Sequence, residues 1–484
     1  MKRVINALFA LLFGAFISPL VGFVFPKGSR HFTPLVTFVS FAIVLSYFNS
    51  PGLITNVLWK APPIGIFIEV DGFNYLMLLL ATGLGFLTAL FASEYMRESP
   101  RLTHYNTLYL LMLTGIVGVI ITGDLFNLYV FFEIASISSY ALVAYHASKG
   151  ALRATTRYLI VGSLGTTLVF LGIILVYSVT GSLNMADIAI KMSSIDSPLL
   201  YVALAFFFIG FGIKADLVPF HAWKPGALSL APSPAASLFA GGSVVMSLYA
   251  IFRIFFTIFL YRPFYFTYIF QFFAVFTMLV GAFLAFRQDD MKKLIAFSGI
   301  SQVGYVFLAV SFSTPAGLFA GLFQMVNLVV SEVLLFLCAG LVARHVGSKK
   351  MDSMSGLFTT LPLASVGILV GAGNIIGIPP FSGFASKILL YQAGFDSGFL
   401  VVTLISLVVS AMTLGYFLKP IFSLSGERRQ YEAVDERKPQ IFIPLASLVV
   451  LCLLLGFFPQ LIYPLLNRAS LALMDPTAYL GVLR

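Results

Sequence analysis

Charged side chains are scarce in this chain. Only 10% of its 484 residues are Asp, Glu, Lys or Arg, whereas a soluble domain carries about a quarter. Hydrophobic residues make up 59% of the chain, so the solvent around most of it must be lipid. This composition excludes an ordinary soluble domain and predicts an integral membrane protein embedded in the lipid bilayer.

Cysteine is almost absent as well. Cys338 and Cys452 lie far apart inside apolar segments, and neither stands in a CxxC or His/Cys spacing that would indicate a metal or haem site. The sequence also contains no GxxxxGK(S/T) loop and no dinucleotide-binding fingerprint. We therefore expect no cofactor and no bound metal. If the chain pumps an ion, an existing gradient or a partner subunit must supply the energy.

What the chain does contain is a series of long apolar runs. A membrane-spanning helix needs about 20 largely apolar residues, and these runs lack the period-two alternation of a membrane barrel. The longest polar stretch, residues 425–440, is too short to form a soluble domain. The sequence predicts an all-α membrane protein, a single bundle of about 14 transmembrane helices at residues 4–25, 32–48, 72–93, 107–123, 125–145, 155–179, 199–230, 235–258, 264–285, 294–312, 315–343, 360–395, 399–420 and 441–464.

The basic residues between these runs predict an orientation. Of the 29 Lys and Arg residues, 19 fall in the odd-numbered gaps, Lys224 among them, and eight fall on the other side with the termini. The positive-inside rule places the odd-numbered loops in the cytoplasm and both termini outside. The same rule accounts for the net charge of +10, so nucleic acid is not an expected partner. We interpret four of these basic residues as anchors at the membrane surface: Arg253, Arg287, Lys292 and Lys293.

Two of the predicted spans are interrupted by proline. The chain reads LVPFHAW around Pro219 and IPPFSGF around Pro380, and each break lies within seven residues of one of the two lysines placed inside the membrane, Lys214 and Lys387. Proline removes an amide donor and obstructs the carbonyl four residues before it, so the first defect opens beside Lys214.

The interrupted spans are the seventh and the twelfth, and an odd separation makes them cross the membrane in opposite directions. That arrangement predicts two inverted five-helix repeats with broken helices 7 and 12. The expected division is helices 1–3 in residues 1–106, helices 4–8 in 107–258, helices 9–13 in 259–421, and a loop with helix 14 in 422–484.

Four ionisable residues stand within apolar spans: Glu133 in the fifth, Lys214 in the seventh, Glu332 in the eleventh and Lys387 in the twelfth. A charge at the centre of a bilayer costs about 2.5–3.5 kcal/mol on insertion scales, so each needs a reason. Buried glutamates and lysines can exchange a proton with a small driving force. The four residues are candidates for a proton relay; the alternative is a set of static ion pairs that fix the helix register.

Four more polar residues are secondary candidates. Asp216 and His221 flank the first break, where His221 could relay protons or cap free carbonyl groups. Gln324 and Asn327 lie in the eleventh span and could line a wetted path or join helices by hydrogen bonds.

Several segments resemble the antiporter-like subunits: the L, M and N subunits of respiratory complex I, the D subunit of Mrp-type sodium/proton antiporters, and their relatives in membrane-bound hydrogenases or sulfur reductases. The similarity extends over about residues 70 to 420 and is carried by GDLFNLYVFFEIASISSYALVAYH, IGFGIKADLVPFHAWKPGALSLAPSPAASLFAG, RQDDMKKLIAFSGISQVGYVFLAV and GIPPFSGFASKILL. The resemblance implies fourteen spans, broken helices 7 and 12, and a polar axis along the membrane. It equates Glu133, Lys214 and Lys387 with the family's glutamate of span 5 and its lysines of spans 7 and 12.

The chain departs from the family pattern at two places. The family usually has a lysine or histidine in span 8 to link the two halves, whereas this span reads LFAGGSVVMSLYAIFR, with Val245 among apolar neighbours. In span 11 the common pattern LFHLLNHALFKALLF becomes LFQMVNLVVSEVLLF, with Gln324 in place of a histidine and Glu332 in place of a lysine. The sequence offers no candidate for the link between the halves.

The resemblance implies a proton- or sodium-translocating, non-redox subunit of a respiratory oxidoreductase or cation/proton antiporter complex in the cell membrane. Its expected partners are other membrane subunits and a peripheral iron–sulfur redox module. Two alternatives stay open: a non-pumping scaffold subunit of such a complex, and a stand-alone transporter of a small solute.

Overall fold

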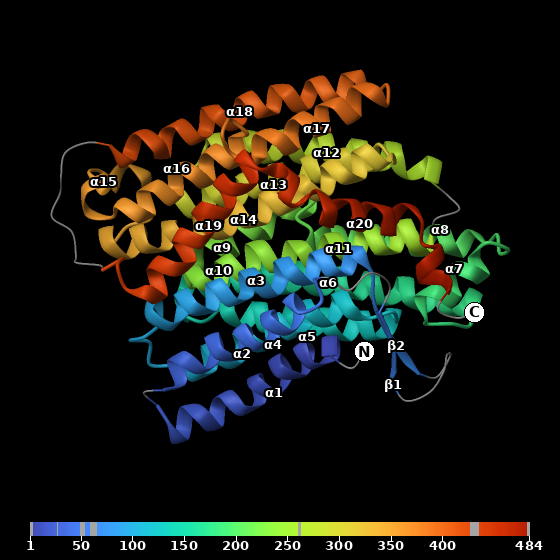
Figure 1. The fold of residues 1–484 in the computed structure, drawn as a ribbon, viewed down its shortest axis with the longest axis horizontal. Coiled ribbons are helices and arrows are strands. Elements are labelled where there is room, and N and C mark those ends of the chain that lie inside the picture. Colours follow the sequence, from blue (N-terminus) through green and yellow to red (C-terminus); the bar gives the residue numbers. More distant parts are fainter. Residues whose placement is uncertain are drawn as a thin grey trace.

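The structure is a computed structural model that describes residues 3–26, 28–48, 54–58, 65–259, 263–425 and 435–481. Its elements form one elongated bundle of helices running in roughly the same direction (Figure 1). Most of the polar loop predicted at 425–440, residues 426–434, lies outside the described residues.

Helices account for nearly all of the described chain. In order they are α1 (Arg3–Val24), α2 (Ser29–Leu45), α3 (Gly72–Tyr95), α4 (Leu102–Ile121), α5 (Leu125–Val143), α6 (Lys149–Thr180), α7 (Met185–Met192), α8 (Pro198–Lys214), α9 (Lys224–Leu230), α10 (Ser233–Leu238), α11 (Val244–Arg253), α12 (Pro263–Phe286), α13 (Met291–Ser311), α14 (Pro315–Val346), α15 (Leu357–Thr360), α16 (Pro362–Ile376), α17 (Ser382–Asp396), α18 (Leu400–Leu424), α19 (Pro439–Phe457), α20 (Tyr463–Met474) and α21 (Thr477–Leu480).

Short segments of other helix types complete the bundle. Tight 3-10 turns are η1 (Phe220–Trp223), η4 (Met351–Ser353) and η5 (Pro459–Leu461), and wide π-helical turns are η2 (Phe239–Ser243) and η3 (Ile254–Ile258). Both π turns lie in the predicted eighth span, one on each side of α11. This span is therefore less regular than its apolar sequence indicates. Turns of this type are rare and are found mostly at functional sites.

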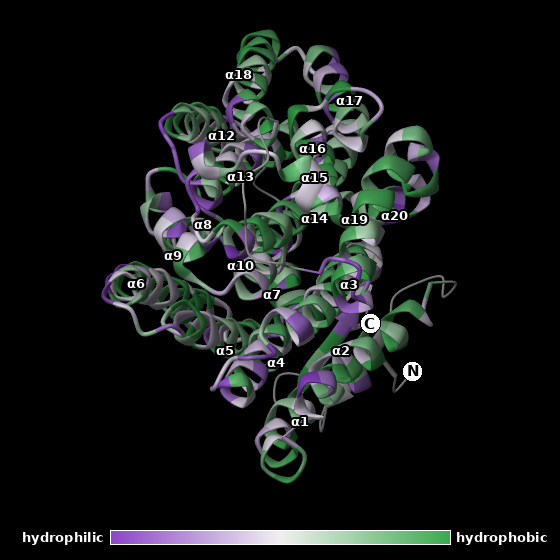
Figure 2. Cartoon of the chain, turned by 90° about the vertical axis from the view of Figure 1, so that its left-hand side faces the viewer, coloured by the Kyte–Doolittle hydropathy of each residue, from purple (hydrophilic) through white to green (hydrophobic). Residues whose placement is uncertain are grey.

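Among the described residues, eleven helical stretches are long and apolar enough to cross a membrane. Three shorter apolar helices join them, α2, α8 and α16. In the view along the bundle, strongly apolar surfaces lie on the outer helices such as α18 (Figure 2), as expected where helices face lipid. In contrast, α13 and α14 are almost wholly enclosed by their neighbours, so they form the core of the bundle.

One part of the chain is not helical, which corrects the all-α prediction. Strand β1 (Ile54–Leu58) pairs antiparallel with strand β2 (Ile66–Val70) in a two-stranded hairpin. Strand β2 lies at the same end of the bundle as α7 and the C-terminus (Figure 1). It also forms a bridge from Ile68 to Thr122, which ties the hairpin to the turn between α4 and α5.

Polar residues and glycines begin and end the helices. Asp71 caps α3 by accepting hydrogen bonds from two backbone amides, and Asn74 reciprocates in a capping box. Three helices, α6, α14 and α16, are followed by glycines at positive φ, Gly181 (64°), Gly347 (72°) and Gly377 (82°). Only glycine adopts that conformation without strain, so these residues define where the helices stop.

Both interruptions predicted from proline are present. Helix α8 ends at Lys214, and the chain resumes helical structure only at η1 and α9. Helix α16 ends at Ile376 and α17 begins at Ser382. The bonds before Pro219 and Pro380 are cis.

Two turns of the fold share one hydrogen-bond pattern. In each, the backbone amide of the first residue of a helix donates to a carbonyl in the loop after the next helix. The amide two residues beyond that carbonyl donates in return to the carbonyl two residues before the first helix. Each residue of the second pair lies 166 positions after its counterpart (Leu125 to Met291, Met185 to Met351). The bonds are Leu125 N to Leu183 O (2.9 Å), Met185 N to Gly123 O (2.9 Å), Met291 N to Lys349 O (3.0 Å) and Met351 N to Asp289 O (2.9 Å).

Candidate functional site: a buried row of charged and polar side chains

The first interruption places Lys214 in an aromatic pocket. Lys214 is 2% exposed, and its ammonium donates to the hydroxyls of Tyr158 (3.0 Å) and Tyr140 (3.3 Å). Trp223, from η1, stacks on Tyr158 with ring centroids 4.2 Å apart and donates its indole N–H to the carbonyl of Ile213. The residues after the break therefore fold back and hold the end of α8 around the lysine.

Beyond the break lies a cluster of buried charges. Lys224, the first residue of α9, forms ion pairs with Asp216 (2.7 Å) and with Glu332 of α14 (3.6 Å). All three are at most 1% exposed. Asp216 has a φ of 65°, a left-handed conformation that aspartate tolerates better than most residues. With Lys214 nearby, the cluster carries two positive and two negative charges, so its net charge is balanced.

This cluster corrects the interpretation of Lys224. The sequence placed Lys224 in a cytoplasmic loop, and the structure places it inside the bundle with no exposed surface. It joins the segment after the first break to the eleventh predicted span, which is the link that the sequence did not offer. No local signal in HAWKPG indicates burial, because the carboxylates that neutralise Lys224 lie outside this stretch, one before the break at Asp216 and one far along the chain at Glu332.

A glycine makes room for this cluster. A side chain on Gly299 of α13 would put its Cβ 1.5 Å from Oε1 of Glu332. Only the absence of a side chain at residue 299 lets the Glu332 carboxylate occupy its position beside Lys224. Nothing in the local sequence distinguishes Gly299 from the rest of the 40 glycines in the chain.

Helix α14 continues the polar row toward the second interruption. Gln324 accepts a hydrogen bond from Ser386 of α17 (2.7 Å) and donates to Gln302 of α13 (3.0 Å). Asn327 accepts from the hydroxyl of Ser382 (2.6 Å) and donates to its carbonyl (3.1 Å). The structure thus brings both secondary candidates of span 11 together with the start of α17.

Asn374, which the sequence did not single out, connects the two halves of the second interruption. Its side-chain oxygen accepts from the backbone of Gly383 (2.6 Å) and lies 3.0 Å from the hydroxyl oxygen of Ser382, which donates its one proton either here or to Asn327. Its amide donates to Ser331 of α14 (2.7 Å). A polar residue in the apolar stretch GAGNII was the available signal, since a buried amide of this kind needs partners on other helices.

Lys387 lies on the far side of the second break. It is 2% exposed, and its ammonium donates to the carbonyls of Ile375 and Ile376, both at 2.9 Å, and to the hydroxyl of Ser410 (2.8 Å). The two carbonyls are at the C-terminal end of α16, where they have no helical partner. A positive charge at that position is further favoured by the helix dipole.

Two candidates lie outside this row. Glu133 of α5 is partly exposed rather than buried, because its helix is near the edge of the bundle. No hydrogen bond or ion pair joins it to Lys214 in the part of the chain that the structure describes. Tyr140, seven residues later on α5, makes the direct contact with the lysine instead. His221 is also only half-buried, and its ring lies edge-on to that of Phe297, with ring centroids 6.4 Å apart.

Two of the presumed surface anchors are also buried. Arg253 has no exposed surface and pairs with Asp71, and Lys292 is 4% exposed and donates to the carbonyl of Ala231 at 3.4 Å. The prediction was wrong for both residues, because a loop-end position in the sequence does not reveal that neighbouring helices cover the side chain. Lys293 is exposed, as expected of an anchor.

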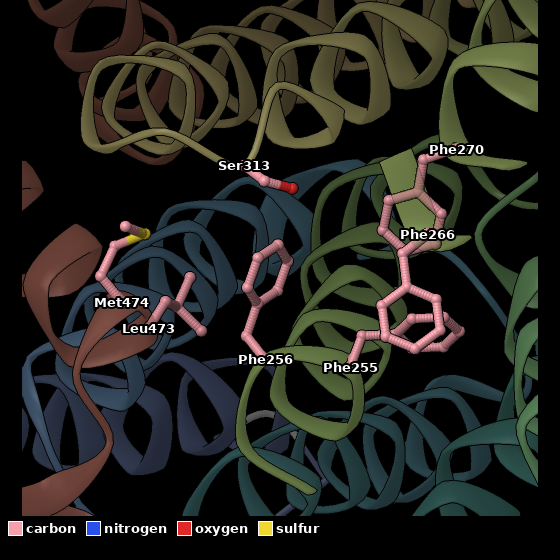
Figure 3. A pocket seen from close by; sticks show the side chains of 7 residues that line it. All are labelled: Phe255, Phe256, Phe266, Phe270, Ser313, Leu473 and Met474. Carbon is pink, nitrogen blue, oxygen red and sulfur yellow. The ribbon is translucent and has the colours of Figure 1, made fainter. Parts of the chain in front are cut away.

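A separate apolar cavity of about 150 Å³ lies beside η3 (Figure 3). Phenylalanines from η3 and α12 face Leu473 and Met474 across it, and Ser313 is its polar lining residue. With no charged group in its lining, this cavity is not part of the polar row.

Comparisons with known proteins place the sequence among membrane antiporter subunits. A family model described as NADH:quinone oxidoreductase/Mrp antiporter, TM matches residues 122–413. A second, described as NADH-Ubiquinone oxidoreductase (complex I), chain 5 N-terminus, matches residues 63–106. The chain is 31% identical over 425 residues to the D subunit of a Na(+)/H(+) antiporter from Alkalihalophilus pseudofirmus, covering 87% of this chain and 86% of that protein.

Two solved structures are similar over the full length of both chains. One is a chain of the membrane-bound sulfane sulfur reductase, an archaeal respiratory membrane complex, with a TM-score of 0.93 and 29% identity. The other is a chain of the Mrp complex from Dietzia sp., with a TM-score of 0.92 and 26% identity. Each match covers 100% of this chain and 100% of the other.

Proposed function

Because this chain belongs to the NADH:quinone oxidoreductase/Mrp antiporter family of transmembrane proteins, we propose that it moves protons or sodium ions as an antiporter-like subunit of a multisubunit membrane complex. The observation that carries the proposal is the buried row of ionisable and polar side chains that runs from Lys214 through Lys224 and Glu332 to Lys387. Ionisable residues inside a membrane bundle are costly and usually mark an ion pathway, and a row of four exceeds what one ion pair fixing the helix register would need.

The proposed architecture has fourteen spans arranged around two inverted five-helix repeats. The eleven long helices and three shorter apolar ones support that number. The shared hydrogen-bond pattern, displaced by 166 residues, supports the repeat. Its first copy is next to β2, and its second leads into η4 and α15 at the opposite end of the bundle (Figure 1), as inversion requires.

In the relay we assign Lys214 to hold and release a proton in its tyrosine pocket. Glu133 acts on Lys214 from a distance, with Tyr140 between them. Asp216, Lys224 and Glu332 carry the charge from one repeat to the other. The side-chain amides of Gln324 and Asn327, with the hydroxyls of Ser386 and Ser382, then lead to Lys387, which exchanges the proton with one aqueous side. His221 lies beside the first break as an entry group for water.

The distribution of basic residues supports a cell-membrane protein with both termini outside. The odd-numbered loops, to which the sequence assigns 19 of the 29 Lys and Arg residues, would then face the cytoplasm; two of the 19, Lys224 and Lys292, are buried in the bundle. The similar chains come from an Mrp complex and from a respiratory membrane complex, so we propose other membrane subunits as partners. A peripheral iron–sulfur module would be a further partner in an assembly of the respiratory type.

Substitution of Lys214 tests the proposal. The complex should be purified with the Lys214→Ala variant, reconstituted in vesicles, and assayed with separate dyes for proton and sodium movement. We expect assembly to persist and transport to fall at least tenfold, while Lys293→Ala, which removes an exposed lysine, leaves transport unchanged. Wild-type transport by an assembled Lys214→Ala complex would instead assign the chain a scaffolding role.

A further inference from the structure

A second buried cluster of charges lies at the hairpin end of the bundle, apart from the proposed relay. Arg253, the last residue of α11, donates to both carboxylate oxygens of Asp71 (2.9 and 2.8 Å) and to the side-chain oxygen of Asn74 (2.6 Å). Arg253 has no exposed surface. The positive charge of the arginine is therefore already matched by Asp71.

Glu69 adds a second carboxylate to this cluster, whose one arginine already neutralises the first. It lies in β2, two residues before Asp71, and it is fully buried. Neither of its oxygens makes a hydrogen bond of good geometry among the described residues. The Tyr479 hydroxyl faces the carboxylate and interacts with it weakly, because its own hydrogen bond is directed at the sulfur of Met185 (3.7 Å). With one arginine and two carboxylates, the ionised cluster has a net negative charge. An unpaired carboxylate without hydrogen bonds is costly to bury, so the cluster favours the uptake of a proton.

The groups around Glu69 come from several elements. Tyr249 and Arg253 face it from α11, Asp71 from the start of α3 and Tyr479 from α21. The backbone of Gly123 covers it from the turn between α4 and α5, where Asp124 is occupied in capping α5. On the hairpin itself, Thr55 is its partner in the register. Arg468 of α20 packs with its backbone against Gly72.

Burial raises the pKa of Glu69 to about 7, while Tyr479 and Arg253 oppose that rise. The group is therefore about half protonated near neutral pH, and its charge responds to small pH changes at this end of the protein.

We propose that Glu69 is a proton-binding site at the hairpin end of the protein, and that its protonation regulates the ion-translocating relay by changing the strength of the ion pair between Asp71 and Arg253. The proton-binding site is inferred from the cluster alone, whereas its regulatory role rests on the proposed function. When Glu69 is protonated, Asp71 is the one charged carboxylate of the cluster that attracts Arg253; when Glu69 is ionised, the two carboxylates compete for the same guanidinium.

The structure contains a connection between this cluster and the relay. Arg253 ends α11, and α11 is bounded by the π turns η2 and η3. In η2, a Cβ on Gly241 would come within 2.7 Å of the side chain of Val333, the neighbour of Glu332 on α14. In η3, Phe255 and Phe256 line the cavity of about 150 Å³, which gives this end of the span room to move (Figure 3).

Infrared difference spectroscopy tests the proton site without any transport assay. The purified complex should be titrated across neutral pH, and the stretching band of protonated carboxyl groups recorded. We expect Glu69→Gln to remove one carboxyl that titrates near pH 7 in the wild type. Asp187→Asn is the matched control, because Asp187 is a partly exposed carboxylate of α7 paired with Lys191. Identical titrations of the wild type and Glu69→Gln would overturn the proposal.

The regulatory part is tested in vesicles by changing the pH on the hairpin side only. Between one pH unit below and one above a pKa of about 7, the protonated fraction of Glu69 falls about tenfold. The wild-type rate should change by up to that factor, and Glu69→Gln should keep the low-pH rate throughout. A variant that retains the wild-type pH response would refute the regulatory role. If the wild-type complex transports no ion, the proposed function fails, and the infrared titration still decides whether Glu69 binds the proton.

Discussion

Removal of the positive charge of Lys224 is the most informative perturbation of the central cluster. Lys224→Met keeps the length and apolar stem of the side chain and deletes its ammonium group. The change leaves Asp216 and Glu332, formerly 2.7 and 3.6 Å from that group, as two buried carboxylates close to Lys214. The number of negative charges then exceeds the number of positive charges by one.

Two independent estimates give a similar free-energy cost for removing the charge of Lys224. Breaking a buried ion pair by removing one partner typically costs about 3–5 kcal/mol. Alternatively, one carboxylate takes up a proton, and protonating a carboxyl of ordinary pKa at neutral pH costs about 4 kcal/mol. A barrier raised by only about 1.4 kcal/mol slows a step tenfold. We therefore expect Lys224→Met to reduce ion transport by well over tenfold.

A double variant separates stability from transport. Lys224→Met combined with Glu332→Gln restores the charge balance, so the assembled complex should regain thermal stability relative to Lys224→Met alone. Transport should stay low, because both ionisable groups of the link are missing. Thermal unfolding and vesicle transport should be measured on the wild type, both variants and the control Lys293→Met, whose lysine is exposed.

Two outcomes would refute this reasoning. If Lys224→Met assembles and transports at the wild-type rate, no ion crosses between the repeats through Lys224. If the double variant transports normally, the ion pair only balances charge within the fold.

Three further substitutions probe other parts of the structure. Gly299→Ala should displace the Glu332 carboxylate, since the new Cβ would fall 1.5 Å from its Oε1, and should lower transport at least tenfold; normal transport would show that the carboxylate can move freely. Lys387→Met should abolish transport and speed hydrogen exchange at the end of α16, because two carbonyls lose their donor; unchanged exchange would contradict the capping role. Burial raises the pKa of Glu69 from 4.5 to about 7, so the stability it contributes is complete below pH 4.5 and is lost as the pH rises through 7. Glu69→Gln should therefore raise the unfolding temperature above pH 7, by an amount corresponding to about 3 kcal/mol, and leave it unchanged below pH 4.5; an equal shift at both pH values would refute this origin.

The parts of the fold that could be predicted are those that lipid and proline dictate locally. Apolar runs must form helices in a bilayer, because their backbone groups have no other partners. Pro219 and Pro380 interrupt those helices where the sequence places them. Lys214 and Lys387 stood out because a charge inside an apolar run is rare, and both are buried beside a break.

Other features depend on contacts that no local pattern records. Lys224 follows an apolar segment and Arg253 ends one, as surface anchors do. Their burial is tolerable only because Asp216 and Glu332 neutralise Lys224 and Asp71 neutralises Arg253, and these pairings cannot be read from the local sequence. The opposite error affected Glu133, whose apolar surroundings in the sequence indicated burial although one face of its helix is partly exposed.

The bonds of Lys387 have a consequence for the loss of its proton. A lysine ammonium has three N–H donors, and here three acceptors use them: the carbonyls of Ile375 and Ile376 and the hydroxyl of Ser410. The neutral amine has only two donors and one lone pair. Ser410 now donates to the carbonyl of Ile376 at 3.3 Å, and a rotation of its hydroxyl would turn that donation toward the amine. Every group would then still have a partner, so a single hydroxyl rotation lets Lys387 give up its proton without breaking the end of α16.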